Sequence, residues 1–202
     1  MATITSITAP ASYRILRTAL TRGEPFRQLD LIRDAKASPS QVSRVIRWLT
    51  ERRHVERLHD GRYRVKGAAS VVSAAVPYYR AMNDALVSSV AIRGSKKAAK
   101  EALVAEGGIL GLESALEEHS EFFRADRVCI YHEQPEDVLR ALTPSEGGIL
   151  NVSVYQPDIP LEGDIDAKRR TSKFRTVLDL SCDGKAYAAK ELFEELWGVV
   201  ID

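Results

Sequence analysis

The stretch that most constrains the fold runs from Ser38 to Val65 and reads SPSQVSRVIRWLTERRHVERLHDGRYRV. Its first half has apolar residues at the period of an amphipathic helix, which predicts one buried face. The residues of that face are Val42, Val45, Ile46 and Leu49. Ser38 followed by Pro39 is typical of a helix start, because a hydroxyl caps free backbone N–H groups and proline suits the first turn. We therefore predict a helix that opens at Ser38.

The second half of the stretch predicts a β-hairpin that turns at Asp60-Gly61. This dipeptide favours a two-residue type I′ turn, since glycine accepts positive φ and aspartate tolerates it. The predicted cross-strand pairs are Leu58 with Tyr63 and Arg57 with Arg64, with His59 and Arg62 flanking the turn. The second pair places two arginines directly opposite each other. Because like charges repel there, the pair favours an anion lying alongside.

Two more helices are predicted upstream, over residues 11–21 and 26–34. The first ends before Gly23, and the second follows Pro25 and has Leu29 and Ile32 as its apolar residues. The predicted order is therefore three helices followed by a small hairpin.

Charge divides the chain into two parts. Residues 1–66 carry 14 Lys and Arg against 6 Asp and Glu, a net charge of +8. Residues 67–202 carry 15 against 22, a net charge of −7. Opposite signs predict two modules with different partners, of which the basic one faces a polyanion.

The first module resembles the winged helix-turn-helix family over about residues 11–66. The stretch from Ser38 matches the family's S-x-S-x-VSR-x-[IL]-x-x-L recognition helix, followed by its wing. The resemblance implies that the third helix enters the DNA major groove and that the wing reaches the backbone or the minor groove. A winged helix that binds proteins through solvated arginines is the alternative, and the charge of +8 favours DNA.

This resemblance implies ten DNA-contacting residues. Candidates for phosphates or base edges are Ser38, Ser40 and Ser43. The candidate base readers are Gln41, Arg44 and Arg47, since arginine can fork onto guanine and glutamine onto adenine. The wing candidates are Arg57, Arg62 and Arg64 as phosphate contacts, with His59 beside them at the turn. Trp48 is interpreted as a packing residue.

The second module predicts helices mixed with strands. After a linker at Gly67, helical character is expected through residues 67–106, with Pro77 at the start of a helix, and again in GLESALEEHSEFF. The predicted strands are RVCIYHE, ILNVSVYQP and KFRTVLDLSC. A short helix, PEDVLRAL, lies between the first two strands, and KAYAAKELFEELWG forms the last helix.

A catalytic set is not predicted in this module. Gly94-Ser95 before a basic helix would suit a nucleotidyltransferase, but that reaction needs an Asp-x-Asp metal site shortly afterwards. EALVAEGG lacks one, and Asp164-Ile165-Asp166 comes far downstream. The cysteines and histidines, namely Cys129, Cys182, His119 and His132, have no ligand or nucleophile spacing. We expect no metal, no cofactor and no enzyme activity.

Two stretches of the second module resemble AbiEi-type antitoxins. They are GILGLESALEEHSEFF and FRTVLDLSCDGKAYAAKELFEELWG. The matching positions are Gly111, Leu112, Ala115, Leu116, Leu178, Asp179, Leu180, Ala189 and Leu192. The resemblance implies a degenerate nucleotidyltransferase-like domain and an autorepressor that binds inverted repeats at its own promoter and opposes a toxin.

The combined prediction is an α+β chain, with a winged helix-turn-helix domain (1–66) followed by a mixed α/β regulatory or partner-binding domain (67–202). The predicted function is sequence-specific regulation through double-stranded DNA. Two alternatives are neutralisation of a toxin or other protein by the acidic domain, and nucleotide binding or transfer. No apolar run reaches the roughly 18–20 residues of a membrane helix, and a cytoplasmic location is expected. A palindrome could be read by a homodimer or by monomers that meet on DNA.

Overall fold

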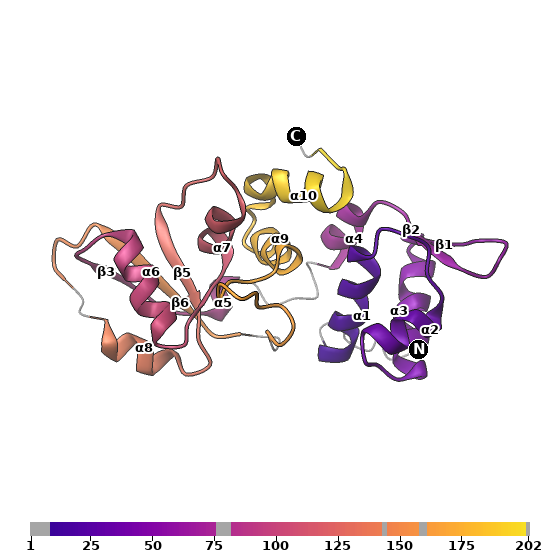
Figure 1. Cartoon of the computed structure of the whole chain (residues 1–202), viewed down its shortest axis with the longest axis horizontal. Coiled ribbons are helices and arrows are strands. Elements are labelled where there is room, and N and C mark those ends of the chain that lie inside the picture. The colour runs from indigo at the N-terminus through magenta and orange to yellow at the C-terminus, as the bar shows by residue number, and fades with distance from the viewer. Residues whose placement is uncertain (1–8, 76–81, 143–144, 158–160, 201–202) are drawn as a thin grey trace. The chain divides into compact units, whose positions relative to one another are not determined.

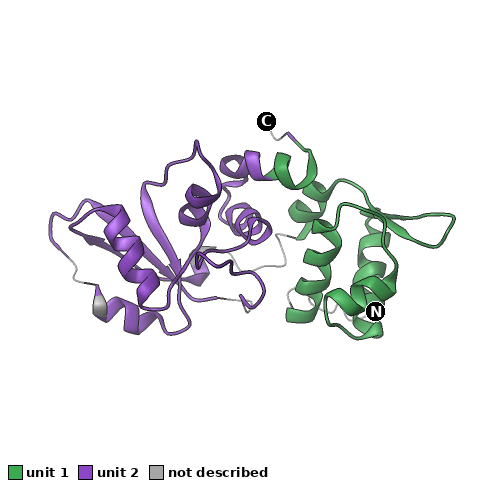
Figure 2. Ribbon diagram, in the orientation of Figure 1, with its two compact units in different colours: residues 1–79, 193–199 green, residues 80–192, 200–202 purple. Residues whose placement is uncertain are grey.

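The computed structural model describes residues 9–75, 82–142, 145–157 and 161–200 (Figure 1). It divides into two compact units, residues 1–79 with 193–199 (unit 1) and residues 80–192 with 200–202 (unit 2) (Figure 2). Helices and strands are mixed in an α+β fold, as predicted. Among the described residues, no helix is both long and apolar enough to cross a membrane.

Unit 1 has the predicted order of three helices and a hairpin. The elements are α1 (Pro10–Thr21), α2 (Gln28–Asp34), α3 (Pro39–Glu51), β1 (Val55–Arg57), β2 (Tyr63–Val65) and α4 (Ala68–Ala75). The predicted start of α3 is confirmed, because the Gln41 backbone N–H donates to Ser38 Oγ. The predicted buried face of α3 is confirmed as well, since Val42 and Leu49 are 0% exposed.

Helix α2 begins later than predicted. The main chain of Phe26 pairs with that of Tyr63 through two hydrogen bonds, of 2.9 and 2.7 Å, so Phe26 extends the hairpin sheet. Of its apolar residues, Leu31 is completely buried, Ile32 is half-buried and Leu29 is 71% exposed. Pairing with a strand 37 residues downstream is a non-local interaction, and the local helical pattern does not reveal it.

The strand register of the hairpin is shifted by one residue from the predicted register. Its pairs are Val55 with Val65, Glu56 with Arg64 and Arg57 with Tyr63. Only Gly61 takes positive φ, at 79°, and its N–H donates to the Leu58 carbonyl. The loop therefore has three residues, which spares Asp60 the left-handed conformation that a type I′ turn requires. The predicted opposition of Arg57 and Arg64 is wrong, since Glu56 lies across from Arg64 and attracts it.

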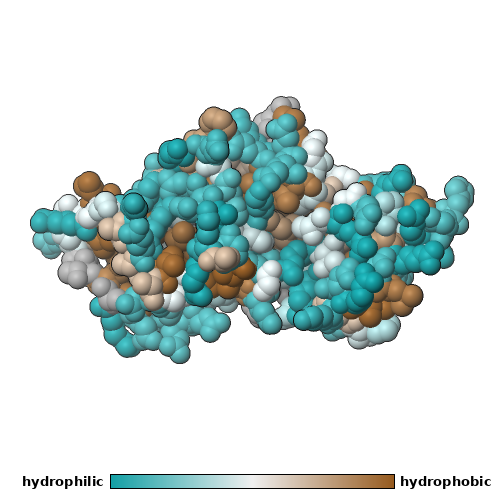
Figure 3. Space-filling view, viewed as in Figure 1, coloured by the Kyte–Doolittle hydropathy of each residue, from teal (hydrophilic) through white to brown (hydrophobic). Residues whose placement is uncertain are grey.

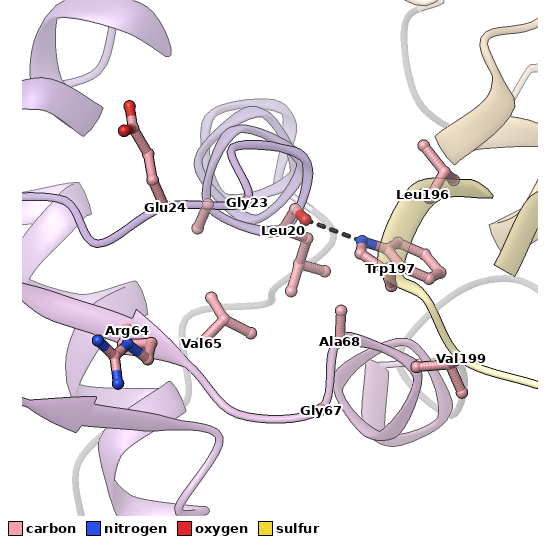
Figure 4. A pocket seen from close by; sticks show the side chains of 11 residues that line it. Leu20, Gly23, Glu24, Arg64, Val65, Gly67, Ala68, Leu196, Trp197 and Val199 are labelled. Carbon is pink, nitrogen blue, oxygen red and sulfur yellow. Dashed lines mark hydrogen bonds between the residues drawn. The ribbon is translucent and has the colours of Figure 1, made fainter. Parts of the chain in front are cut away.

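Unit 1 contains more of the chain than the predicted domain 1–66. Helix α4 buries Val71, Val72 and Ala75. The last part of α10 (Lys190–Trp197) also belongs to this unit, and Trp197 Nε1 donates to the Leu20 carbonyl at 2.9 Å (Figure 4). A cavity of about 490 Å³ lies beside this bond, lined by apolar side chains together with Glu24 and Arg64 and by no residue of α3.

Unit 2 is built around a four-stranded sheet. Its elements are α5 (Met82–Ala85), β3 (Leu86–Ile92), α6 (Lys96–Ala105), β4 (Ile109–Leu110), α7 (Leu112–His119), β5 (Arg127–Tyr131), α8 (Pro135–Ala141), β6 (Leu150–Tyr155), α9 (Lys173–Cys182), the 3₁₀-helix η2 (Ala186–Ala189) and the start of α10. The strand order is β3-β6-β5-β4, and only β5 and β6 run parallel.

Helices cover both faces of the sheet. On one face, Val128, Ile130, Val152 and Val154 are completely buried in a core that includes Leu103 of α6 and Val138 of α8. On the other face, Cys129 Sγ lies 3.3 Å from Glu113 of α7, and Arg175 of α9 lies over the Tyr131 ring. Successive residues of a strand point to opposite faces of the sheet. In β5, Val128 and Ile130 therefore face α6 and α8, while Cys129 and Tyr131 face α7 and α9.

Two predictions for unit 2 are wrong. Residues 86–92 form a strand, because β6 supplies a partner for a segment rich in valine. Residues 173–182 form helix α9, which Ser172 caps and an Arg175–Asp179 ion pair of 2.7 Å spans. Helix α9 is buried on all sides over residues 174–180, so its sequence lacks the one-sided apolar pattern of a surface helix. A short run of this kind cannot be told from a buried strand by its periodicity. The predicted strands β5 and β6 and helix α8 are confirmed. Helix α7 ends at His119, before the end of its predicted stretch, and the predicted last helix begins with the 3₁₀-helix η2. Pro77 lies outside the described residues.

The environment of His119 predicts that the stability of unit 2 depends on pH. Its Nε2 lies 2.8 Å from the Thr171 carbonyl, which requires the proton on Nε2. Burial disfavours the charged ring and holds the pKa of His119 below its ordinary 6.5, with help from Arg170 and Lys173. The Thr171 hydrogen bond and the Asp166 charge oppose this shift but do not outweigh it. The folded state therefore binds fewer protons, so this contribution is present above pH 6.5 and is lost as pH falls towards the folded pKa.

Urea unfolding between pH 7.5 and 5.5 checks this expectation. His119→Gln keeps a donor for Thr171, and its stability should fall less with decreasing pH than that of the wild type. Parallel curves for His119→Gln and the wild type would contradict the assigned role of His119.

Candidate nucleic-acid interface

Helix α3 presents a polar face opposite its buried stripe. Ser40, Arg44 and Arg47 are exposed and lie at i, i+4 and i+7, so they share one side of the helix. Ser43 is half-buried next to them. The apolar stripe fixes this arrangement, since rotating α3 about its axis would bring Val42 or Leu49 into water.

The start of α3 uses two of the predicted contact residues for its own cap. Gln41 Oε1 accepts hydrogen bonds from Ser38 N at 2.9 Å and Ser38 Oγ at 3.0 Å. Ser38 Oγ also lies 3.1 Å from Ser40 Oγ. A forked contact from Gln41 to adenine would need its carboxamide oxygen as well as its nitrogen. Gln41 would therefore have to leave the cap in order to read a base.

Two of the predicted wing contacts are held by carboxylates. Arg62 Nε lies 2.6 Å from Asp60 Oδ2, and Arg64 Nη1 lies 3.5 Å from Glu56, which Lys66 also contacts at 3.0 Å. The Arg62 backbone N–H and then its side chain lower the pKa of Asp60. The Lys66 hydrogen bond is the main cause that lowers the pKa of Glu56. Exposed pairs of this kind are weak, so a phosphate could displace the carboxylate.

Several arginines of unit 1 have no carboxylate within ion-pair distance among the residues that the structure describes. On the predicted DNA-facing surface they include Arg47 on α3, Arg57 on β1 and Arg27 before α2. Arg27 was missed at the sequence level, because only the pairing of Phe26 with Tyr63 brings it to the wing. His59 is exposed in the loop, and hydrophilic residues cover the hairpin on the face that Figure 3 shows.

Trp48 lies beside this surface and is half-buried. Its ring centroid is 5.8 Å from that of His54, and the Arg52 guanidinium lies 4.6 Å from the ring. Burial, followed by the Arg52 charge, lowers the pKa of His54. These contacts are those of a packing residue at the end of α3.

The aspartates considered for metal binding in unit 2 are engaged in its loops. Asp164 is completely buried and accepts a hydrogen bond from Ser172 Oγ at 2.9 Å, while Asp166 pairs with Arg170. Ser95 caps α6. Across the described part of the chain, no group of three or more His, Cys, Asp or Glu residues is placed to hold a metal ion.

One charged cluster of unit 2 escaped sequence reasoning. Glu113 contacts Arg127 at 2.9 Å and Lys185 at 2.7 Å, and Asp183 contacts the same two cations. Burial alone would raise the pKa of Glu113, but the Lys185 hydrogen bond and the Arg127 charge hold it below the ordinary value. Burial raises the pKa of the neighbouring Cys129 thiol. Two carboxylates balance two cations, an arrangement that fastens α7 to the loop after α9.

Comparison with protein-family models, curated proteins and solved structures returned no match.

The positive φ of Gly61 in the hairpin loop can be tested by substitution. Gly61→Ala places a side chain at φ 79° with no atom within 4 Å of its Cβ, so only conformational strain results. We expect it to cost about 1–2 kcal/mol and to speed amide hydrogen exchange in β1 and β2. Gly184→Ala has similar strain in unit 2 and should leave the hairpin amides unchanged. Unchanged exchange in Gly61→Ala would exclude the three-residue loop.

Proposed function

We propose that this protein is a sequence-specific DNA-binding transcriptional regulator. In this proposal α3 of unit 1 lies in the major groove and the hairpin acts as its wing. The observation that carries the proposal is the exposed row of Ser40, Arg44 and Arg47 on a helix that is rigidly seated by its buried face. A row of this kind can present arginine forks to the base edges of successive base pairs.

Electrostatics supports duplex DNA as the partner. Residues 1–66 carry a net charge of +8, and much of this charge lies on α3, on the hairpin and at the start of α2. A cluster of cations releases counterions from the DNA backbone, which gives affinity independent of sequence. Base contacts from α3 would then supply specificity. Unit 2 would dimerise, sense or bind a protein, and the internal engagement of Asp164 and Asp166 supports a role without nucleotide transfer.

The primary experiment measures binding to a fluorescent duplex from the upstream region of the chain's own gene. A scrambled duplex serves as the reference, at two salt concentrations. A regulator should bind the upstream duplex more tightly at both salts. Equal, weak binding that disappears with salt would leave only a basic surface and would contradict the proposal.

Arg44 and Arg47 are expected to discriminate between sequences. Arg44→Ala or Arg47→Ala should weaken binding to the upstream duplex by about 1–3 kcal/mol, through loss of a base contact, and should change scrambled binding much less. Fluorescence anisotropy on both duplexes measures this. Arg140→Ala removes one exposed arginine from unit 2 and should bind like the wild type. If neither α3 variant loses affinity for the upstream duplex, α3 is not in the groove.

Glu56 is expected to limit the affinity of the wing. Glu56→Gln removes the carboxylate that holds Arg64 and Lys66, so both cations become available to phosphates. Binding should tighten on every duplex, and the slope of log K against log salt should steepen by about 1 or more. Glu136→Gln, which removes an exposed carboxylate in unit 2, is the matched control. Weaker binding by Glu56→Gln would exclude a DNA-facing wing.

A further inference from the structure

A cleft of about 370 Å³ lies within unit 1, between the start of α2 and the hairpin. Arg27, Gln28 and Leu29 line it from the helix side. The hairpin side is formed by Arg57, Asp60, Gly61 and Tyr63. No residue of α3 lines the cleft, so it is separate from the exposed row on that helix.

Pairing of the backbone holds the two sides of this cleft together. Tyr63 pairs with Phe26 on one edge and with Arg57 on the other. The rings of Phe26 and Tyr63 stack with centroids 6.3 Å apart, and Gln28 Nε2 donates to the Tyr63 hydroxyl at 3.3 Å. Arg27 lies between Phe26 and Gln28 in the chain, so the contacts of these two residues hold it beside the hairpin. The cleft is therefore built by the fold before any ligand arrives.

The charge of the cleft is net positive, although the Asp60 carboxylate attracts Arg27 across it without forming an ion pair. No carboxylate of the described residues lies within ion-pair distance of Arg27 or Arg57, whereas Arg22, Arg33, Arg62 and Arg64 each have one. Asp60 is the acidic residue of the lining, and its ion pair is with Arg62, at 2.6 Å, so the two cleft arginines outweigh its remaining charge. Two arginines from opposite sides thus face a common space, which suits an anion with several acceptor oxygens.

An apolar side chain stands at the edge of the same cleft. Leu29 is 71% exposed, although it is large and lies on a helix that buries Leu31. A phosphate alone would not contact such a side chain favourably. A phosphodiester carries a deoxyribose next to its charge, and this ring offers apolar atoms to Leu29.

We propose that the cleft binds one phosphodiester of the DNA backbone together with its adjoining deoxyribose. Arg27 and Arg57 hold the phosphate oxygens from two sides, and Leu29 contacts the sugar. This inference rests on the proposed function and adds a binding site that includes Arg27. A phosphate contact carries no base information, but it fixes the orientation of the protein on the duplex. The cleft would therefore set the register in which α3 meets the bases.

Charge-neutral variants of the whole chain test the cleft. Arg27→Gln and Arg57→Gln should each weaken binding about tenfold, equally on upstream and scrambled duplexes, and each should reduce the salt slope by about 0.9. Arg33→Gln is the matched control, because Arg33 is an exposed arginine on α2 that Asp34 already pairs. Circular dichroism and thermal unfolding verify that the variants fold. If Arg27→Gln binds like Arg33→Gln, the cleft does not hold DNA.

A second measurement locates the phosphate. Uncharged methylphosphonates replace one phosphate of the upstream duplex at a time. Wild-type binding should weaken at one position where Arg27→Gln and Arg57→Gln show no further loss, because the partner of that phosphate is already missing. Equal losses in the wild type and both variants at every position would overturn the assignment.

Further outcomes distinguish a DNA phosphate in the cleft from free phosphate, and failure of the cleft assignment from failure of the proposed function. Inorganic phosphate, compared with chloride at equal ionic strength, should not displace the duplex, and displacement by millimolar phosphate that Arg27→Gln abolishes would assign the cleft to free phosphate instead. If the wild type discriminates between duplexes and Arg47→Ala abolishes discrimination while Arg27→Gln changes nothing, only the cleft is wrong. If the wild type binds no duplex, the proposed function fails, and the cleft assignment fails with it.

Discussion

Burial of the apolar stripe on α3 is the constraint on which unit 1 depends. Val42 and Leu49 are completely buried, and Val45 and Ile46 nearly so. Each such side chain contributes about 1.5–3 kcal/mol through its removal from water. That stabilisation fixes the rotation of α3 about its own axis, and in this orientation Ser40, Arg44 and Arg47 face outward. Packing that stabilises the core thereby also determines which polar groups can meet a partner.

Pairing of Phe26 with Tyr63 organises the charges around that helix. It shortens α2, joins the start of α2 to the hairpin and brings Arg27 to the cleft. The three-residue loop has a comparable effect on the hairpin, because it places Glu56 opposite Arg64. Arg64 is thus partly neutralised, while Arg57 keeps its full charge at the cleft. A shift of one residue in strand register therefore redistributes which cations a phosphate would meet.

Unit 2 is organised in a different way. Its sheet is covered by helices on both faces, and its polar residues are used inside the unit. The Arg175–Asp179 pair is almost completely buried, and the Glu113 cluster balances its own charges. A site prepared for metal or phosphate chemistry would instead keep its charges directed at a ligand. In the proposed function, unit 1 would contact DNA and unit 2 would regulate.

The sequence by itself determined the features that arise from neighbouring residues. The stripe and cap of α3, the existence of the hairpin, and helices α6, α7 and α8 follow from short-range periodicity and capping. The α3 face of the candidate site follows in the same way, since it is the complement of the stripe. Tertiary structure alone decided whether residues 86–92 and 173–182 became strand or helix, because a short apolar run buries equally well as either until its partners are known. It also decided the hairpin register and the position of Arg27, since both depend on backbone pairing between segments that are far apart in the chain.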